Sequence, residues 1–273
     1  MNLVTFAKLG SFGRLCNQMF QIASSIGIAR RNGFDFAFPY WRNTDALNFG
    51  QTNIVEVQDR FINPLPVYNG PELPEYGVPF GYQDVILSHS VSLLGHFQSE
   101  RYFEHAIDEV RWYFRMKGEQ PLNDYCAIHY RAGDYGAAAT KYKPQGNAFH
   151  PRMALDYYEP AMKLFGSDQK FLVFSDDIEA ARELFGDRVE YSQQADDLDD
   201  FRVLKTCRHY IIANSSFSLM AAILSDGDDK QVVCPSPWFG GPYRGTLDES
   251  DIASRGWHVV NWETGVVEVK GSC

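Results

Sequence analysis

The chain has 273 residues and a formal net charge of −10 at pH 7. Hydrophobic residues make up 45% of the sequence and charged residues 22%, a composition that excludes a disordered, collagenous or repetitive chain. The acidic balance argues against a nucleic-acid binder, and the length allows one large domain or two smaller ones.

The cysteines and the apolar segments indicate the compartment. Five cysteines, at positions 16, 126, 207, 234 and 273, form no CxxC pair. An odd number without paired spacing predicts reduced thiols and argues against a zinc site. The N-terminus has no apolar run of signal-peptide length, and no segment approaches the ~20 apolar residues of a membrane span. We therefore expect a cytoplasmic protein without stable membrane insertion.

The first forty residues predict a βαβ unit. The alternating segment NLVTFA at 2–7 predicts a strand. Apolar residues spaced by three and four from Leu15 to Ala29 predict a helix that ends at Gly33. The segment 34–39 predicts the next strand, and the connection between the two strands is expected to be right-handed.

The rest of the first half is less regular. Residues 62–84 are rich in proline and glycine and predict a long loop without regular structure, either functional or a plain surface excursion. A strand is predicted at 90–97 and a helix at 99–116. The polar segment 117–124 is the predicted domain boundary, which divides an N-terminal α/β domain, 1–118, from a C-terminal domain, 119–273.

The second half predicts a Rossmann-like domain. Strands alternate with helices of about 10–15 residues, the pattern of a parallel sheet in a doubly wound fold. In chain order the predicted elements are a strand at 125–130, a helix at 151–166, a strand at 170–177, a helix at 178–186, a strand at 189–193, a helix at 197–207, a strand at 209–214, a helix at 215–226 and a strand at 231–238.

Polar clusters follow four of the predicted strands. Ligands of an open parallel sheet bind outside the carboxyl ends of its strands, so these clusters are expected to converge on one crevice. The clusters are GSFGRLCNQ with Arg14 and Asn17, RAGD with Arg131 and Asp134, SDD with Asp176, and NSSFS with Ser215 and Ser216.

Arg131 and Asp176 each have two interpretations. Arg131 ends an apolar strand, where its charged fork suits a phosphate; a salt bridge to Asp134 or another carboxylate is the alternative. The SDD segment at 175–177 either holds a divalent metal or caps the following helix, and capping is the better interpretation.

The NSSFS segment begins a helix. Asn214, Ser215 or Ser216 is expected to cap it, and a helix N-terminus also suits a phosphate oxygen. From these residues alone we expect a two-domain α/β enzyme that binds a phosphorylated or nucleotide ligand.

Taken together, the motifs resemble the α-1,2-fucosyltransferase family. Segments similar to that family's motifs occur in order as GRLCNQMFQ at 13–21, GHFQSERYF at 95–103, HYRAGD at 129–134, FSDD at 174–177 and IIANSSFSLMAA at 211–222. One departure is Cys16, which stands where the family usually has glycine. A positive φ at this position would strain the backbone.

The resemblance implies a GT-B-like α/β fold, with two Rossmann-like domains facing a cleft. It implies transfer of L-fucose with inversion from GDP-β-L-fucose to the 2-hydroxyl of a terminal galactose in a glycan, without a metal cofactor. A transferase of another nucleotide sugar, or an inactive glycan-binding relative, is the alternative.

The resemblance also implies roles for residues. Arg131 is similar to the family's diphosphate anchor, and Asp200 to an aspartate that accepts from guanine N1 and N2. Asn17 is expected near the fucose or the diphosphate. The other residues expected to bind the donor are Arg14, Asp176, Ser215, Ser216 and Phe217.

The general base is not assigned by the motifs. His129, Asp134 and Glu100 are the candidates for taking the proton of the acceptor hydroxyl. Orientation of Arg131 by His129 is the slightly preferred interpretation of that histidine.

Overall fold

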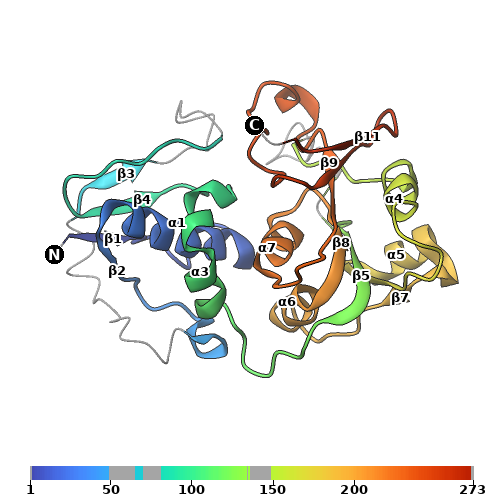
Figure 1. The fold of residues 1–273 in the computed structure, drawn as a ribbon, viewed down its shortest axis with the longest axis horizontal. Helices are drawn as coiled ribbons and strands as arrows, with labels where there is room; N and C mark the ends of the chain where they lie inside the picture. The colour runs from blue at the N-terminus through green and yellow to red at the C-terminus, as the bar shows by residue number, and fades with distance from the viewer. Residues whose placement is uncertain (1, 49–64, 70–80, 134, 136–148, 272–273) are drawn as a thin grey trace, which may run out of the picture. The chain divides into compact units, whose positions relative to one another are not determined.

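The chain divides into two compact units, and each has its own sheet (Figure 1). Unit 1 is Met1–Glu119 with Ser250–Ile252, and unit 2 is Gln120–Glu249 with Ala253–Cys273. The computed structural model describes residues 2–48, 65–69, 81–133, 135 and 149–271. Both units are mixed α/β with parallel strands, as the predicted fold class requires.

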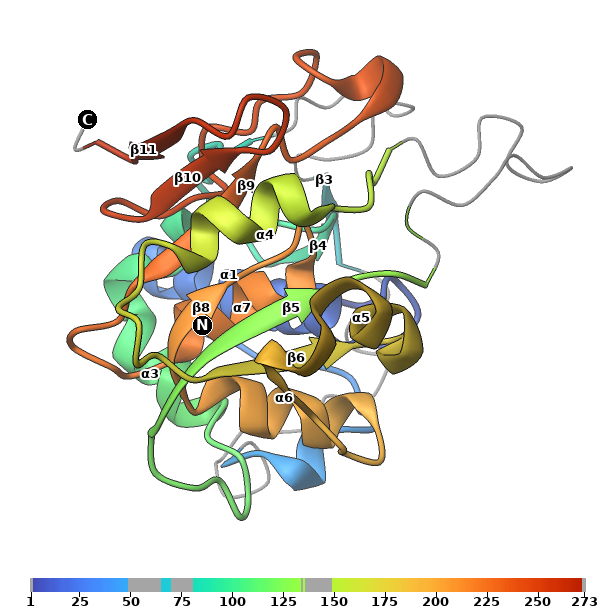
Figure 2. The same ribbon diagram turned by 90° about the vertical axis from the view of Figure 1, so that its right-hand side faces the viewer.

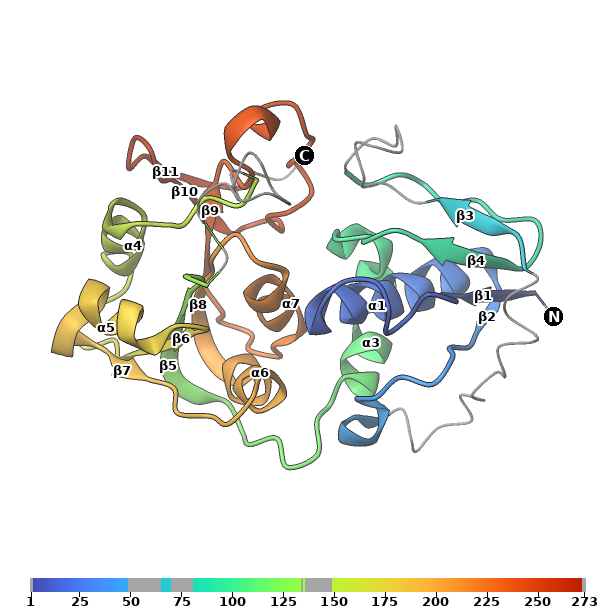
Figure 3. The same ribbon diagram turned by 180° about the vertical axis from the view of Figure 1, so that it is seen from behind.

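Unit 1 contains a four-stranded parallel sheet in the order β2-β1-β4-β3 (Figure 3). Its strands are β1 (Leu3–Thr5), β2 (Asp35–Phe36), β3 (Val67–Asn69) and β4 (Val91–Leu94). Its helices are α1 (Leu15–Asn32), α3 (Ile107–Tyr113) and the short 3₁₀ turns η1 (Thr44–Ala46), η4 (Glu100–Tyr102) and η5 (Glu104–Ala106). The predicted β1–α1–β2 unit is confirmed.

Helix α1 is the central helix of unit 1. It is buried almost throughout from Leu15 to Ala29, which agrees with apolar residues on more than one of its faces. Gly33 adopts a left-handed conformation and caps the last carbonyls, as the glycine at this position predicts. Near this end Arg30 pairs with Glu109 of α3 at 2.5 Å.

Two predictions for unit 1 are wrong. The segment 62–84 contains the strand β3, whose pairing with β4 at the sheet edge overrides the local proline signal; 62–64 and 70–80 lie outside the described residues. The helix predicted over 99–116 is interrupted at Phe103 and Ala106, with φ values of −135° and −120°. These breaks allow both Tyr102 and Phe103 to be buried.

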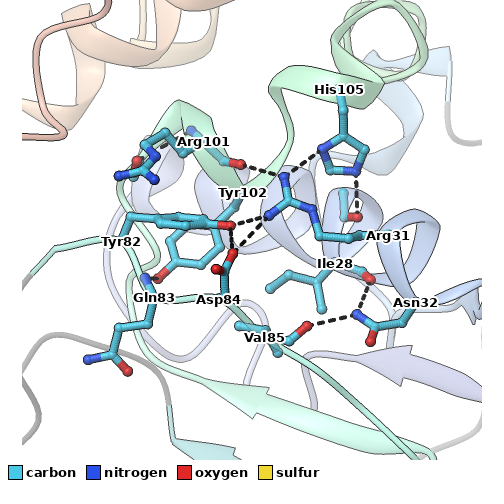
Figure 4. A network of polar contacts seen from close by, with 12 residues as sticks. Ile28, Arg31, Asn32, Tyr82, Gln83, Asp84, Val85, Arg101, Tyr102 and His105 are labelled. Carbon is cyan, nitrogen blue, oxygen red and sulfur yellow. Dashed lines mark hydrogen bonds and ion pairs between the residues drawn. The ribbon is translucent and has the colours of Figure 1, made fainter. Parts of the chain in front are cut away.

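A polar network joins the C-terminal end of α1 to residues 81–84 (Figure 4). Arg31 donates to the Tyr82 hydroxyl and, at 3.2 Å, to the carbonyl oxygen of Arg101. The Arg101 guanidinium lies 4.0 Å from the centre of the Tyr82 ring. Asp251 accepts from the Tyr82 amide at 2.7 Å and pairs with Arg101 at 2.9 Å. These contacts explain why the short segment 250–252 belongs to unit 1.

Unit 2 contains a seven-stranded sheet in the order β11-β10-β9-β8-β5-β6-β7, parallel except for β11. Its strands are β5 (Asn123–Tyr130), β6 (Phe171–Ser175), β7 (Glu190–Tyr191), β8 (Cys207–Ile211), β9 (Val232–Ser236), β10 (His258–Asn261) and β11 (Val267–Val269). Its helices are α4 (Leu155–Met162), α5 (Ile178–Phe185), α6 (Asp197–Lys205) and α7 (Ser216–Leu224), with 3₁₀ turns η6 (Gly186–Arg188) and η7 (Gly241–Tyr243).

The central strand β5 has helices on both faces of the sheet. Figure 1 shows α4 and α5 on one face and α6 and α7 on the other, and Figure 2 shows β5 between β6 and β8. Ile128 and Tyr130 belong to the core cluster that includes Tyr157 and Tyr158 of α4. Since side chains alternate along a strand, His129 lies on the opposite face, toward α7.

The alternation predicted for the second half is confirmed, with differences at its ends. The helix predicted at 151–166 is shorter, and the strands β10 and β11 were not predicted. Both lie beyond the last predicted strand, where the alternating apolar pattern is short. Cys16, Cys126, Cys207 and Cys234 are buried and form no disulfide among the described residues.

Candidate functional site

The strand order of unit 2 reverses between β5 and β8. Strand β5 pairs with β6 on one side and with β8 on the other. The chain continues from β5 to β6 and from β8 to β9, so the two connections leave in opposite directions at this point. Such a switch point opens a crevice at the carboxyl ends of the two strands, where α/β proteins bind ligands. The residues that follow β5, β6 and β8 are therefore the candidates for a site.

Arg131 follows β5 and pairs with Asp176, which follows β6. The Arg131 Nη1 atom lies 2.8 Å from Asp176 Oδ2, and the two side chains are 18% and 25% exposed. The Tyr135 ring lies on Arg131 as well, 5.5 Å from the guanidinium carbon. The salt bridge expected as an alternative for Arg131 thus exists, and its partner is Asp176. Asp134 lies outside the described residues.

Asp176 also holds the loop after β5. Its Oδ1 atom accepts from the backbone amides of Ala132 at 2.9 Å and Gly133 at 3.2 Å. A Cβ atom at Gly133 would lie 2.0 Å from Asp176 Oδ2, so only glycine leaves room for this carboxylate.

The neighbouring carboxylate, rather than Asp176, caps helix α5. Asp177 is the N-cap of α5 and accepts from the Ala180 amide at 3.0 Å. The capping interpretation of the SDD segment is confirmed for Asp177, whereas Asp176 contacts Arg131.

The segment after β8 begins α7. Ser215 is the N-cap residue, and its hydroxyl accepts from the Phe217 amide at 3.4 Å. Just before it, the carbonyl oxygen of Asn214 accepts from the Tyr135 hydroxyl at 3.1 Å. The clusters after β5, β6 and β8 are thus connected by direct contacts, as the topology predicts. Ser216 is the first residue of α7.

His129 is buried beneath this site. Its Nδ1 atom lies 2.8 Å from the Ser218 hydroxyl, and its ring centre lies 5.4 Å from that of Phe217. Burial lowers the pKa of His129 to about 3, and the nearby charge of Arg131 acts in the same direction. The imidazole is therefore neutral near pH 7 and in contact with the first turn of α7.

Phe217 and Asp200 lie on neighbouring helices. The Phe217 ring contacts Phe201 of α6, with ring centres 5.6 Å apart. Asp200, also in α6, accepts from the Ser192 hydroxyl at 2.5 Å. Burial raises the pKa of Asp200, and the Ser192 hydroxyl opposes this shift. A half-buried carboxylate of this kind is stabilised by additional hydrogen-bond donors.

The two central strands of unit 1 are β1 and β4. The loop after β1 turns at Gly13, whose φ is 81°, and Arg14 follows as the exposed N-cap residue of α1. Asn17, in the first turn of α1, accepts from Gln98 at 3.0 Å. Gln98 follows β4, so this amide pair joins the carboxyl ends of the two central strands.

Two buried glutamines hold the loop before α1. Gln18 donates to the carbonyl oxygen of Gly13 at 2.8 Å, and Gln21 donates to that of Phe12 at 2.9 Å. Trp41 donates to Gln18 Oε1 at 2.6 Å. The sequence interpretation assigned no role to these glutamines. Polar side chains among the apolar residues spaced from Leu15 to Ala29 were the available signal.

The residues after β4 are held in an unusual backbone conformation. Phe97 is buried and has a φ of 52°, and Ser24 donates to its carbonyl oxygen at 3.0 Å. The neighbouring His96 stacks on Phe12, with ring centres 4.6 Å apart and an interplanar angle of 17°. Burial lowers the pKa of His96 to about 4. His96 and Gln98 both follow β4, and Phe12 and Asn17 both follow β1, so the neutral ring pair and the amide pair come from the same two chain segments.

Cys16 does not strain the backbone. It lies in the first turn of α1, and the positive φ belongs to Gly13, three residues earlier. Its side chain is buried. The departure from the family motif therefore leaves the loop geometry intact.

Two general features concern metals and membranes. Within the described ranges, no group of three or more His, Cys, Asp or Glu side chains is arranged to hold a metal ion. A helix that is both long and apolar enough to cross a bilayer is likewise absent from these ranges.

Comparison with known proteins identifies the family of this two-unit α/β chain. Residues 86–261, more than half of the chain, match the sequence profile of glycosyl transferase family 11. The chain belongs to this family. The predicted family resemblance is confirmed.

Two relatives from Escherichia coli are similar in sequence. The O-antigen biosynthesis glycosyltransferase WbnK is 30% identical over 193 residues, which cover 67% of this chain and 60% of that protein. The chain thus spans less than two thirds of this relative. An alpha-1,2-colitosyltransferase is 27% identical over 275 residues, covering 88% of this chain and 93% of that protein. Among solved structures, the fucosyltransferase NodZ from Bradyrhizobium is a distant likeness, with 14% identity, 82% and 93% coverage and a TM-score of 0.46.

Proposed function

We propose that this protein transfers L-fucose, with inversion, from GDP-β-L-fucose to the 2-hydroxyl of a terminal galactoside in a surface glycan or oligosaccharide. The observation that carries the proposal is Arg131, held at the switch point of unit 2 next to the N-terminus of α7. Membership of glycosyl transferase family 11 supports it.

Arg131 and the start of α7 bind the diphosphate in this proposal. A guanidinium offers two parallel N–H donors to phosphate oxygens, and the amides at a helix N-terminus add partial positive charge. Ser215 and Ser216 contribute their hydroxyls at this helix end. As the bond between fucose and the β-phosphate breaks, negative charge grows on the diphosphate, and these groups stabilise it. The same charges make a metal unnecessary for departure of GDP.

Phe217 and Asp200 bind the guanine in this proposal. The contacts of Phe217 with His129 and Phe201 hold its ring in one place. Asp200 accepts from guanine N1 and N2, which supplies the donors that a half-buried carboxylate requires. His129 acts as a positioning residue for α7 through Ser218, rather than as the base.

Unit 1 binds the acceptor in this proposal. Asn17 and Arg14 lie at the carboxyl end of β1, the position at which an α/β unit presents residues to a ligand. Asn17 hydrogen-bonds to hydroxyl groups of the sugars, and Arg14 contributes positive charge at the same strand end. Asp134 is retained as the candidate base on sequence grounds, because it follows Arg131 by three residues.

A colitosyl transferase is the second candidate. The relative named as an alpha-1,2-colitosyltransferase aligns with 88% of this chain. The two sugars would be distinguished by contacts to the donor sugar, which family membership does not determine.

The test is incubation of the purified protein with GDP-fucose and a panel of β-galactosides, with and without EDTA, and with mass spectrometry of the products. We expect a fucosylated galactoside, linked at the 2-hydroxyl by NMR, in both conditions. Product only from a nucleotide-activated colitose would favour the second candidate. Loss of product with EDTA would overturn the metal-independent mechanism, and no product from any donor would overturn transferase activity.

A further inference from the structure

We propose that Asp176 and Tyr135 are positioning residues that hold the Arg131 guanidinium in its donor-binding orientation, and that Asp176 itself binds neither substrate nor metal. This inference rests on the proposed function, in which Arg131 binds the diphosphate. It replaces the substrate-binding role that the family resemblance implies for Asp176.

The Asp176 carboxylate is occupied by contacts within the protein. One carboxylate oxygen pairs with Arg131, and the other accepts from the amides of Ala132 and Gly133. A carboxylate has about four acceptor positions, so three are occupied by the loop that carries Arg131. A metal ion or a sugar hydroxyl would have to compete with charge-assisted hydrogen bonds that are already formed.

Tyr135 holds Arg131 from a second direction. Its ring lies 5.5 Å from the guanidinium carbon, within the range of a cation–π interaction. The ring is stacked on His150, with centres 4.7 Å apart and planes at 6°. Its hydroxyl donates to Asn214, the residue before the α7 N-cap. Tyr135 therefore fixes the position of Arg131 relative to the helix end that is proposed to bind the same diphosphate.

The advantage of such a clamp is preorganisation. A free arginine side chain loses about 2 kcal/mol of conformational freedom when it is immobilised by a ligand. An arginine that is already fixed loses less on binding, and correct placement of a charge within about 1 Å can change rates ~100-fold. The carboxylate weakens attraction of the diphosphate through its own charge, so the proposal requires that orientation outweighs this loss.

Two substitutions test the carboxylate independently. Asp176→Asn keeps an oxygen for the two backbone amides and removes the charge that pairs with Arg131. Gly133→Ala keeps the charge but places a Cβ 2.0 Å from Asp176 Oδ2, which forces the carboxylate away from Arg131. The matched controls are Asp177→Asn, in which asparagine caps as well as aspartate, and Gly166→Ala, where a Cβ meets nothing within 4 Å.

The readouts are GDP affinity by calorimetry, kcat and KM for GDP-fucose and for the acceptor, and the unfolding temperature. We expect Asp176→Asn and Gly133→Ala to weaken GDP binding and lower kcat/KM for GDP-fucose about tenfold or more, with the acceptor KM unchanged. Tyr135→Phe, which loses only the link to Asn214, is expected to show a smaller loss in the same direction. Both controls should behave as the wild type.

A double-mutant cycle distinguishes positioning from direct binding. In an Arg131→Ala background, Asp176→Asn should cause no further loss of kcat/KM for GDP-fucose, because its effect passes through Arg131. Additive losses, or a Mn²⁺ dependence that disappears in Asp176→Asn, would overturn the inference. If the wild type binds GDP and Arg131→Ala abolishes binding while Asp176→Asn and Gly133→Ala bind normally, the inference fails and the proposed function stands. If the wild type does not bind GDP, the proposed function itself fails.

Discussion

The central strands of the two units are followed by different chemistry. In unit 2, β5 and β6 are followed by the ion pair of Arg131 and Asp176. In unit 1, β1 and β4 are followed by the amide pair of Asn17 and Gln98. A fixed cation suits a diphosphate, whereas neutral amides and rings suit a sugar that carries many hydroxyls and no charge. The difference therefore supports a donor side in unit 2 and an acceptor side in unit 1.

Both units hold their loops in the same way. In unit 2 a carboxylate, Asp176, accepts from the backbone amides of the loop. In unit 1 two buried amides, Gln18 and Gln21, donate to the backbone carbonyls of the loop. Side chains from a neighbouring element thus satisfy backbone groups of each loop.

The largest expected effect comes from removing the charge on the donor side. Arg131→Ala should abolish measurable GDP binding and lower kcat/KM for GDP-fucose by about 10³-fold, the size found for loss of one group that stabilises developing charge. Arg188→Ala is the control, since Arg188 makes a surface pair with Glu159 at 3.5 Å. Calorimetry and initial rates provide the measurement. Activity of Arg131→Ala within a few-fold of the wild type would remove the basis for placing the donor in unit 2.

The corresponding change on the acceptor side is Gly13→Ala. The new Cβ would lie 2.5 Å from the Cβ of Asn17, and φ at this position is 81°. We expect a loss of about 1–3 kcal/mol of stability from strain, together with a raised acceptor KM because Asn17 is displaced. Gly10→Ala, at φ 85° with open space around it, is the matched control for strain alone. An equal acceptor KM in the two variants would argue against Asn17 at the acceptor site.

Acid should destabilise unit 2 through His129. The pKa of this imidazole is about 3 in the folded protein and about 6.5 when unfolded, so the unfolded chain binds more protons between these values. Stability is then fully present above pH 6.5 and falls as the pH decreases toward 3. By pH 4.5 the loss is about 2–3 kcal/mol, at about 1.4 kcal/mol for each pH unit.

Urea unfolding at pH 7.0, 5.5 and 4.5 measures this effect. The His129→Gln variant should lose less stability between pH 7.0 and 4.5 than the wild type does. His89→Gln, a substitution of an exposed histidine in unit 1, should show the same pH dependence as the wild type. An identical acid response of wild type and His129→Gln would contradict the buried, neutral state of this ring.

The smallest expected effect distinguishes the role of Asp177 from that of Asp176. Asp177→Ala removes the N-cap of α5 and should lower stability by about 1 kcal/mol without changing GDP affinity. Thermal unfolding and GDP titration are the measurements. A loss of GDP affinity in this variant would mean that the SDD segment acts on the donor as a whole, and that Asp176 has no separate role.

The sequence predicted the elements whose signal is local. The spacing of apolar residues from Leu15 to Ala29 predicts α1, and the apolar run before Arg131 predicts β5, because both patterns repeat within one element. Order along the chain then places the residues after β5, β6 and β8 at one edge of a parallel sheet, which the structure confirms. The prediction that Arg131 binds a diphosphate stays a prediction.

What the sequence could not determine depends on contacts between distant residues. Nothing local shows that Asp176 pairs with Arg131, or that Gln18 and Gln21 hold the loop before α1. The strand β3 forms only because β4 lies beside it.

By itself, then, the sequence determined the family, most of the strands and helices and the places where polar clusters follow the strands, since each of these depends on a short segment of chain. Only the tertiary structure decided which polar groups are partners, because hydrogen bonds and ion pairs depend on atoms that folding brings together from residues as far apart as 131 and 176.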